Sequence, residues 1–241
     1  MKPFESQTSS TYEKAPEGQH IAKLIGIIDE GTQRWEFANE EKTGQKIYLQ
    51  FEVYPEDEKG NVLKTQANEY FTIGEEFTSS LSEKSNLTKL ITAWRGKPLA
   101  KEDYPFDFSR MLGKFALISV AHRPSADGTK VYANRAGIGP VPRKLSVDSE
   151  GKSILHDSGT KCFFFDLDAE DWPAMLDIYS SRLWRNIQMK INLSPEYARR
   201  NGTAPLSPPT FSSGTTSLVQ PKAGSQSGTN ANDDFQDDIP F

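Results

Sequence analysis

A regular alternation of apolar and polar residues runs from Gln45 to Tyr54, and it constrains the fold more than any other feature of the sequence. Successive side chains of a β-strand point to opposite faces, so this pattern predicts a strand with one face in a core. The inward face would hold Ile47, Leu49, Phe51 and Val53, and the outward face Lys46, Tyr48, Gln50, Glu52 and Tyr54. A sheet that buries one face is therefore expected around this segment.

Four further segments predict strands, and a fifth predicts a helix between the third and fourth strands. The additional strands are expected at residues 20–29, 63–73, 114–123 and 130–138, with turns at Gly44 and at 124–128. The helix is expected at residues 81–95, where Leu87, Leu90, Ile91 and Trp94 form one apolar stripe. Five strands with a helix after the third is the order of an OB-fold barrel. We therefore predict a mainly β fold, a five-stranded OB-fold barrel.

The composition changes sharply near residue 200. Residues 201–232 hold 19 Gly, Pro, Ser or Thr in 32 positions and a single charge, so they cannot bury enough apolar surface to offset the entropy of ordering them. The resulting division is a flexible N-terminus (1–17), the barrel (18–144), a helical extension packed on it (145–200), a disordered linker (201–232) and an acidic tip (233–241). Within the extension, a strand is expected at 161–168 and a helix at 171–191.

Several classes of protein are disfavoured. The lone Cys162 excludes a disulfide framework and multi-cysteine metal sites. No apolar run approaches the roughly 20 residues that a membrane span needs, and the polar N-terminus does not suggest a signal peptide. The sequence has no G-x-x-x-x-G-K-[ST] phosphate loop. We therefore expect a cytoplasmic protein with no membrane contact.

One acidic cluster invites a catalytic interpretation, that of a two-metal nuclease. It consists of Asp166, Asp168, Glu170 and Asp171. No histidine or further carboxylate joins it at a recognisable spacing, and acids at this place suit the N-terminus of the following helix. We therefore predict no enzymatic activity, no metal and no cofactor.

The net charge of −5 is unevenly distributed. Residues 201–241 carry a net charge of −3 and residues 1–109 a net charge of −6, whereas residues 110–200 carry 14 bases and 10 acids. The net acidity is therefore no argument against a nucleic-acid partner.

The C-terminal tip carries a resemblance. It reads Asp233-Asp234-Phe235-Gln236-Asp237-Asp238-Ile239-Pro240-Phe241, and it resembles the acidic end of bacterial single-stranded-DNA-binding proteins, in which an OB-fold and a Gly/Pro/Ser-rich linker precede such a tip. The stretches 17–22, 28–33, 94–98 and 132–134 resemble a bacteriophage group of the same functional class. The resemblance implies a protein of the bacterial host's cytoplasm that binds single-stranded DNA. It also implies that Asp233, Asp234, Phe235, Asp237, Asp238, Ile239, Pro240 and Phe241 bind partner proteins.

Binding of single strands without sequence preference requires a basic groove and aromatic faces for stacking. Outward positions of the predicted strands, and the loop expected after residue 29, supply such residues. A single outward tyrosine is more often a packing residue than a base platform, so the set carries more weight than any member. The predicted DNA-binding residues are Arg34, Trp35, Lys46, Tyr48, Tyr54, Tyr70, Lys114, Arg123, Lys130 and Tyr132.

These features give a functional hypothesis and two alternatives. The protein would coat single-stranded DNA during phage replication, recombination or repair, and its tip would recruit phage or host proteins. The alternatives are a replication adaptor and a strand-annealing recombination protein. Self-association is an open possibility, and we hypothesise that the tip also competes weakly with DNA for the groove.

Overall fold

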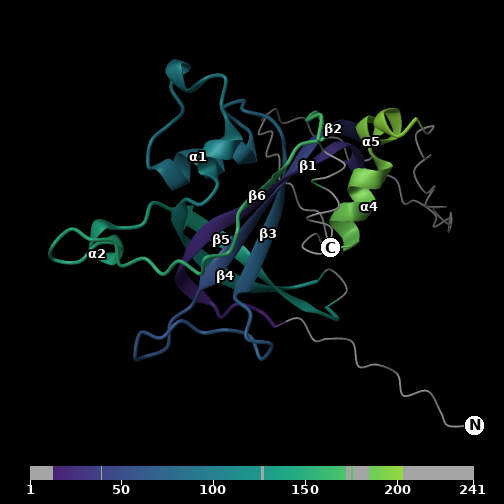
Figure 1. Ribbon diagram of the computed structural model, residues 1–241. Coiled ribbons are helices and arrows are strands. Elements are labelled where there is room, and N and C mark those ends of the chain that lie inside the picture. Colours follow the sequence, from purple (N-terminus) through teal and green to yellow (C-terminus); the bar gives the residue numbers. More distant parts are fainter. Residues whose placement is uncertain (1–12, 39, 126–127, 172–174, 176–184, 203–241) are drawn as a thin grey trace, which may run out of the picture.

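The computed structural model (Figure 1) describes residues 13–38, 40–125, 128–171, 175 and 185–202. Its main element is an open sheet whose antiparallel path runs β3-β2-β1-β4-β5, with the short β6 pairing parallel to β1. The strands are β1 (Gly18–Phe37), β2 (Glu40–Tyr54), β3 (Phe71–Thr78), β4 (Phe115–Pro124), β5 (Val131–Gly139) and β6 (Phe163–Phe165). The predicted mainly β class is confirmed. A closed barrel is not seen, because β3 and β5 are the two ends of the path.

Helices are few and short in the described part of the chain. They are α1 (Asn86–Arg95), α2 (Arg143–Ser146), α4 (Arg185–Leu193) and α5 (Pro195–Arg200), with the 3-10 turns η1 (Lys101–Asp103) and η2 (Phe108–Met111). Helix α1 lies between β3 and β4 in sequence, as predicted. It begins where Ser85 Oγ accepts a hydrogen bond from Thr88 N, and it ends at Gly96, whose φ of 68° suits glycine. None of the described helices is long and apolar enough to cross a membrane.

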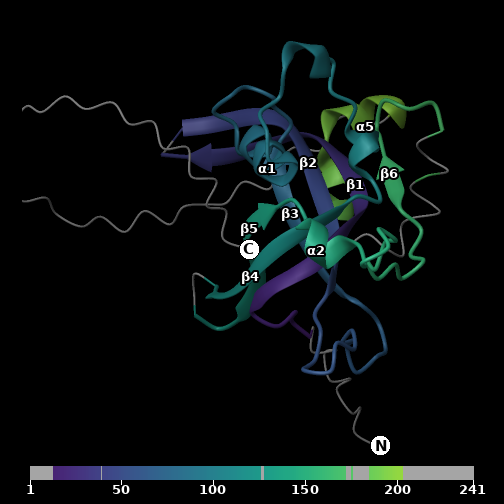
Figure 2. The same cartoon turned by 90° about the vertical axis from the view of Figure 1, so that its left-hand side faces the viewer.

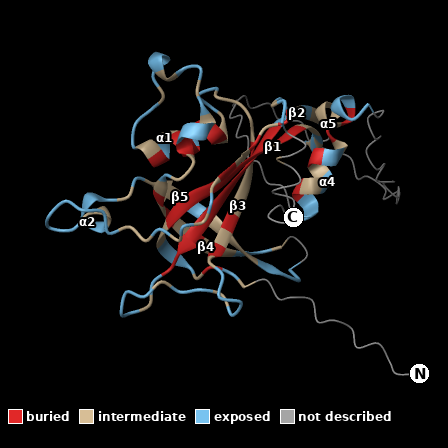
Figure 3. Cartoon of the chain, viewed as in Figure 1, coloured by how far each residue is buried: buried red, intermediate tan, exposed pale blue. Residues whose placement is uncertain are grey.

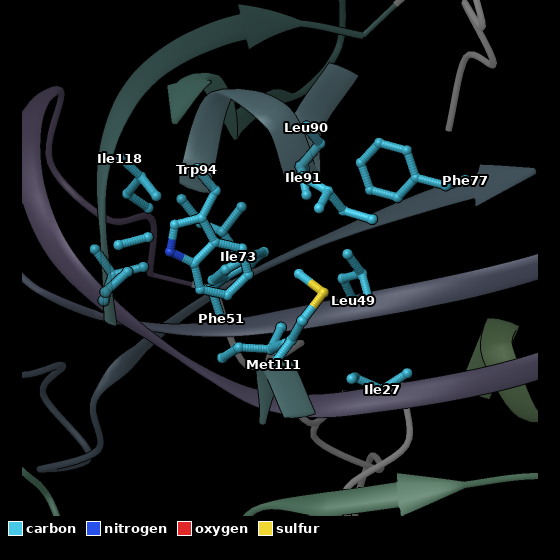
Figure 4. Close-up of a cluster of buried hydrophobic side chains, with 14 of the residues drawn as sticks. Ile27, Leu49, Phe51, Ile73, Phe77, Leu90, Ile91, Trp94, Met111 and Ile118 are labelled. Atoms are coloured by element: carbon cyan, nitrogen blue, oxygen red, sulfur yellow. The ribbon is translucent and has the colours of Figure 1, made fainter. Parts of the chain in front are cut away.

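The main core lies between the sheet and α1. Leu87, Leu90, Ile91 and Trp94, the predicted stripe of α1, are all buried there. Figure 4 shows Trp94 and Ile91 facing Phe51 and Leu49 of β2. The Trp94 ring lies 5.6 Å from that of Phe51, and its Nε1 donates to Phe115 O at 2.8 Å. The inward face predicted for β2 is therefore confirmed.

The outward face predicted for β2 is also buried, which corrects the expectation that it meets solvent (Figure 3). At Tyr48 this face belongs to a second apolar cluster, made of Ile28, Tyr48, Phe163, Phe165, Leu167, Ile187 and Ile191. These residues come from the sheet, from β6 and its flank, and from α4. Residues 163–167 and 187–191, distant in sequence, thus supply a second layer that the alternation within β2 does not reveal.

The limits of several elements differ from those predicted. Strand β1 continues to Phe37 instead of ending at residue 29, and Gly44 lies within β2, opposite Gln33, instead of forming a turn. Residues 63–70 precede β3 and are not part of it. The flexible N-terminus predicted for residues 1–17 is wrong at Ala15, which is buried in the core.

Other predictions fall outside the described residues. Most of the helix expected at 171–191 lies there, although α4 covers its end. Nearly all of the linker and the whole acidic tip lie there as well.

Gly74 of β3 gives a test of the second layer. The Tyr48 side chain crosses directly over this glycine, and a Cβ atom at residue 74 would lie 1.5 Å from the Tyr48 hydroxyl oxygen. Gly74→Ala should therefore lower the free energy of unfolding by about 1–3 kcal/mol, the usual cost of overpacking. Gly139→Ala in β5 is the matched control, because nothing lies within 4 Å of its Cβ position. Equal urea-unfolding midpoints for the two variants would contradict this packing.

Candidate nucleic-acid interface

A groove of about 580 Å³ lies where β3 and β5 face each other beside α1. Two glutamates of β3, Glu75 and Glu76, are its acidic residues, and four bases also line it: Lys46, Lys89, Arg123 and Arg135. Arg135 spans the gap, because its Nε and Nη2 atoms donate to the Glu75 carboxylate at 2.6 and 2.9 Å. Lys89 and Arg123 are exposed. The groove is therefore basic overall, with two cations open to a ligand.

The paired ends of β1 and β2, residues 31–37 and 40–45, form a two-stranded ribbon that projects from the body (Figure 2). Trp35 pairs with Lys42 and Phe37 pairs with Glu40, and residues opposite each other in an antiparallel pair share a face. Trp35, Phe37 and Lys42 thus share one face, which we call the aromatic ribbon face. Both rings are half-buried, and Lys42 Nζ lies 4.6 Å from the Phe37 ring centroid.

Lys46 connects the aromatic ribbon face to the groove. Its ammonium lies 4.0 Å from the Trp35 ring centroid, and Lys46 also lines the groove. The side chain is only 2% exposed, and Glu76 Oε1 at 3.5 Å and Thr78 Oγ1 at 3.2 Å hold its ammonium. Gly44 lets the indole lie close to the strand, since a Cβ atom there would be 3.2 Å from it. Lys46 therefore contacts the Trp35 ring and is also one of the residues that line the groove.

The β4–β5 hairpin brings a second set of predicted residues to the groove. Arg123 is opposite Tyr132, so their side chains share a face, and Lys130 directly precedes β5. Arg123 and Lys130 are exposed and Tyr132 is half-buried. Figure 2 shows the β1–β2 and β4–β5 hairpins projecting to the same side of the molecule. Together they flank the groove with aromatic rings and cations.

Below this surface lies a buried charge cluster. The Lys190 ammonium of α4 contacts the Glu76 carboxylate and lies 4.0 Å from Glu30 Oε2. Burial and the Glu76 carboxylate raise the pKa of Glu30 from 4.5 to about 9. Burial also raises the pKa of Glu76, but the protonated Glu30 and the Lys190 and Lys46 ammonium groups outweigh it, so the Glu76 pKa is lowered. Glu30 is therefore neutral at pH 7, and Glu76 carries the charge that holds both lysines.

Two of the predicted aromatic residues, Tyr48 and Tyr54, present no face for stacking in this structure. Tyr48 is 3% exposed, beneath the second layer, and Tyr54 is 2% exposed. The Tyr54 hydroxyl donates to Glu52 Oε1 at 2.6 Å, and its ring packs 5.1 Å from His156. Burial and the Glu52 carboxylate raise the Tyr54 pKa. Both positions therefore depart from the predicted outward set, because residues from the C-terminal extension cover them.

Three further predicted residues lie elsewhere. Arg34 is exposed on the ribbon face opposite Trp35 and pairs with Glu41 at 3.4 Å. Tyr70 contacts His156, with Nε2 and hydroxyl oxygen 2.9 Å apart. Lys114 is exposed but lines a different pocket. Of the predicted residues, only Lys46 and Arg123 therefore line the groove, while Trp35 contacts Lys46 and Tyr132 pairs with Arg123.

The prediction missed Phe37, Lys42, Lys89 and Arg135. The signal for Phe37 was present, because Trp35 and Phe37 are two residues apart and would share a face if the strand continued. Lys89 lies on the exposed side of α1, which the apolar stripe of that helix implies. Arg135 depends on how β5 approaches β3, which the local sequence does not specify.

The described residues contain no group of three or more His, Cys, Asp or Glu side chains arranged to hold a metal ion. No protein-family model matches the chain, and comparison with curated proteins finds no match.

The buried Glu30 carboxyl predicts a specific pH dependence. The folded state keeps this proton up to about pH 9, whereas the unfolded chain loses it near 4.5, so the contribution of Glu30 to stability falls as pH rises between these values. Glu30→Gln keeps a neutral side chain of similar shape and should remove this loss. Urea unfolding from pH 6 to 9 should show the variant gaining stability relative to the unchanged protein.

Glu58→Gln is the control, since Glu58 is exposed in the β2–β3 connection. A Glu30→Gln variant whose stability stays parallel to that of the unchanged protein over this range would contradict the assignment.

Proposed function

We propose that this protein binds single-stranded DNA, without strong sequence preference, across the groove and the two hairpins beside it. The observation that carries the proposal is the position of Lys46, which contacts the Trp35 ring and also lines the basic groove. Aromatic rings next to cations are what non-specific single-strand binding requires, because every base has a π-face and every nucleotide a phosphate.

The strand order supports an OB-type fold as part of this proposal. The sheet path β3-β2-β1-β4-β5, with α1 between β3 and β4, has the order expected of an OB barrel opened between β3 and β5. OB-folds use the connection between their first two strands and that between their last two to bind oligonucleotides. In this chain those connections belong to the hairpins that carry the aromatic ribbon face and Tyr132.

Each group has a definite part in the proposed complex. Bases stack on Trp35, Phe37 and Tyr132, and phosphates lie near exposed cations such as Lys89 and Arg123. Stacking on these rings needs unpaired bases, so single strands are favoured over duplexes. The favourable free energy comes from stacking and from counterions released by the phosphates, so binding needs no cofactor or catalytic step.

The biological role follows from the resemblance of the sequence. In this proposal the protein protects and organises single strands during phage DNA replication, recombination or repair in the bacterial cytoplasm. The acidic tip binds partner proteins through an aromatic ring, a terminal carboxylate and surrounding aspartates, chemistry that suits an apolar pocket with a basic rim.

The aromatic ribbon face gives the direct test. Trp35→Ala and Phe37→Ala should each weaken binding of a fluorescent oligo-dT by about 10- to 100-fold at low salt, since each stacked base contributes about 1–3 kcal/mol. Thr43→Ala is the matched control, because Thr43 is exposed on the opposite face of the same ribbon. Affinities that stay the same in all three variants, with unchanged circular dichroism, would remove the ribbon from the interface.

Salt dependence tests the groove. The logarithm of the affinity should fall linearly with the logarithm of salt concentration, and Arg123→Ala should reduce the slope by about 1. Lys59→Ala, which changes an exposed lysine in the β2–β3 connection, should leave the slope unchanged.

Equal affinity for duplex and single strands would contradict the proposal. Absence of DNA binding would favour the adaptor, and catalytic annealing of complementary oligonucleotides would favour the recombination protein.

A further inference from the structure

Residues 140–155 form an arm that extends away from the sheet (Figure 1). Most of it is exposed (Figure 3), including two large apolar side chains, Leu145 at 42% and Ile154 at 54%. They are close in the arm, because Ile154 N donates to the carbonyl oxygen of Ser146, the residue after Leu145. Exposed apolar side chains that gather at one place on a surface commonly mark an interaction site.

The arm is a preformed hairpin. Val147 and Ser153 form an antiparallel bridge, and Asp148 Oδ1 accepts hydrogen bonds from the backbone N atoms of Glu150 and Lys152, both at 2.9 Å. These bonds satisfy the turn internally, so the arm keeps its shape without resting on the body. A preformed element loses less conformational entropy when it binds.

A second unexplained feature is a pocket of about 660 Å³ between α1 and residues 102–114. Half of its lining residues are apolar or aromatic, namely Ile91, Trp94, Tyr104, Pro105, Phe106 and Met111, and the other half are charged. Tyr104 is the most exposed of the apolar half, at 46%. The walls are fixed in place, since Arg95 binds Asp103 at 2.9 and 3.1 Å and the Tyr104 hydroxyl donates to Leu81 O at 3.2 Å. The pocket is therefore rigid and large enough for apolar side chains.

Charges on the two features are compatible. Arg143 and Lys144 stand directly before Leu145 and are exposed. Glu102 and Asp107 are exposed carboxylates among the residues that line the pocket. The pocket also has three cations: Arg95 pairs with Asp103, Arg110 lies 3.4 Å from Asp107, and Lys114 is exposed. Glu102 forms no ion pair among the described residues, so it is available to a base from the arm.

We propose that the occupant of this pocket is the arm of a second copy of this chain, with Leu145 and Ile154 entering between Tyr104 and Phe106. Arm and pocket lie close together on each protomer, because a Cβ atom at Gly96, the end of α1, would lie 3.6 Å from Pro140, where the arm begins. Figure 2 shows α2 and α1 on the same side of the sheet. Two copies related by a two-fold axis can therefore exchange arms reciprocally, which gives a closed dimer.

This surface is separate from the groove, so the proposal does not depend on DNA binding. The test is sedimentation velocity of the full chain without DNA. The unchanged protein should be a dimer at micromolar concentration. Ile154→Asp in the arm and Tyr104→Asp in the pocket should each raise the dimer dissociation constant at least about tenfold, because each places a carboxylate in the apolar contact. Met189→Asp, equally exposed on α4, is the control and should remain a dimer.

Mixing the two variants gives a sharper result. A mixture of Ile154→Asp and Tyr104→Asp contains one intact arm and one intact pocket, so mixed dimers should form at concentrations where neither variant dimerises alone. A monomeric unchanged protein would overturn the proposal, as would a dimer that both variants leave intact. Assemblies that grow steadily with concentration would overturn the closed two-fold arrangement.

Discussion

The buried ammonium of Lys46 is the interaction on which the candidate site depends. A charge removed from water is tolerated only when an opposite charge or several polar groups meet it, and here Glu76 and Thr78 of β3 do so. The same Glu76 also holds Lys190 of α4, and its charge is kept because its neighbour Glu30 stays neutral. The same set of charges therefore attaches the second layer and positions Trp35.

The gap between β3 and β5 leaves the space in which the groove forms. A continuous ladder of backbone hydrogen bonds would fill this space with main chain, whereas here the side chains of Arg135 and Glu75 cross it. Side chains leave room for a ligand and present charge to it. The groove thus arises because the sheet stays open at the place where the helix α1 and two strand edges converge.

Local patterns in the sequence predicted what depends on local structure. The stripe of α1 and the inward face of β2 follow from periodicity, and both were predicted correctly. The burial of Tyr48 and Tyr54 could not be predicted from local periodicity, because the residues that cover them are more distant in sequence. The ribbon was missed for another reason. Both of its faces are polar or only partly buried, so it lacks the alternation that reveals a strand, and Trp35 and Phe37 were not seen as one surface.

The pairing of β1 with β6 bears on how the chain folds. Strands β1, β2 and β3 follow one another and can pair early, whereas Gly26 pairs with Phe163 from far along the sequence. Contacts between such distant residues form late, because a long loop must close first. During synthesis, Ile28 and Tyr48 therefore remain uncovered until α4 has been made. The nascent chain carries an apolar sheet face through most of its production, and that interval is when it is most exposed to aggregation or to a chaperone.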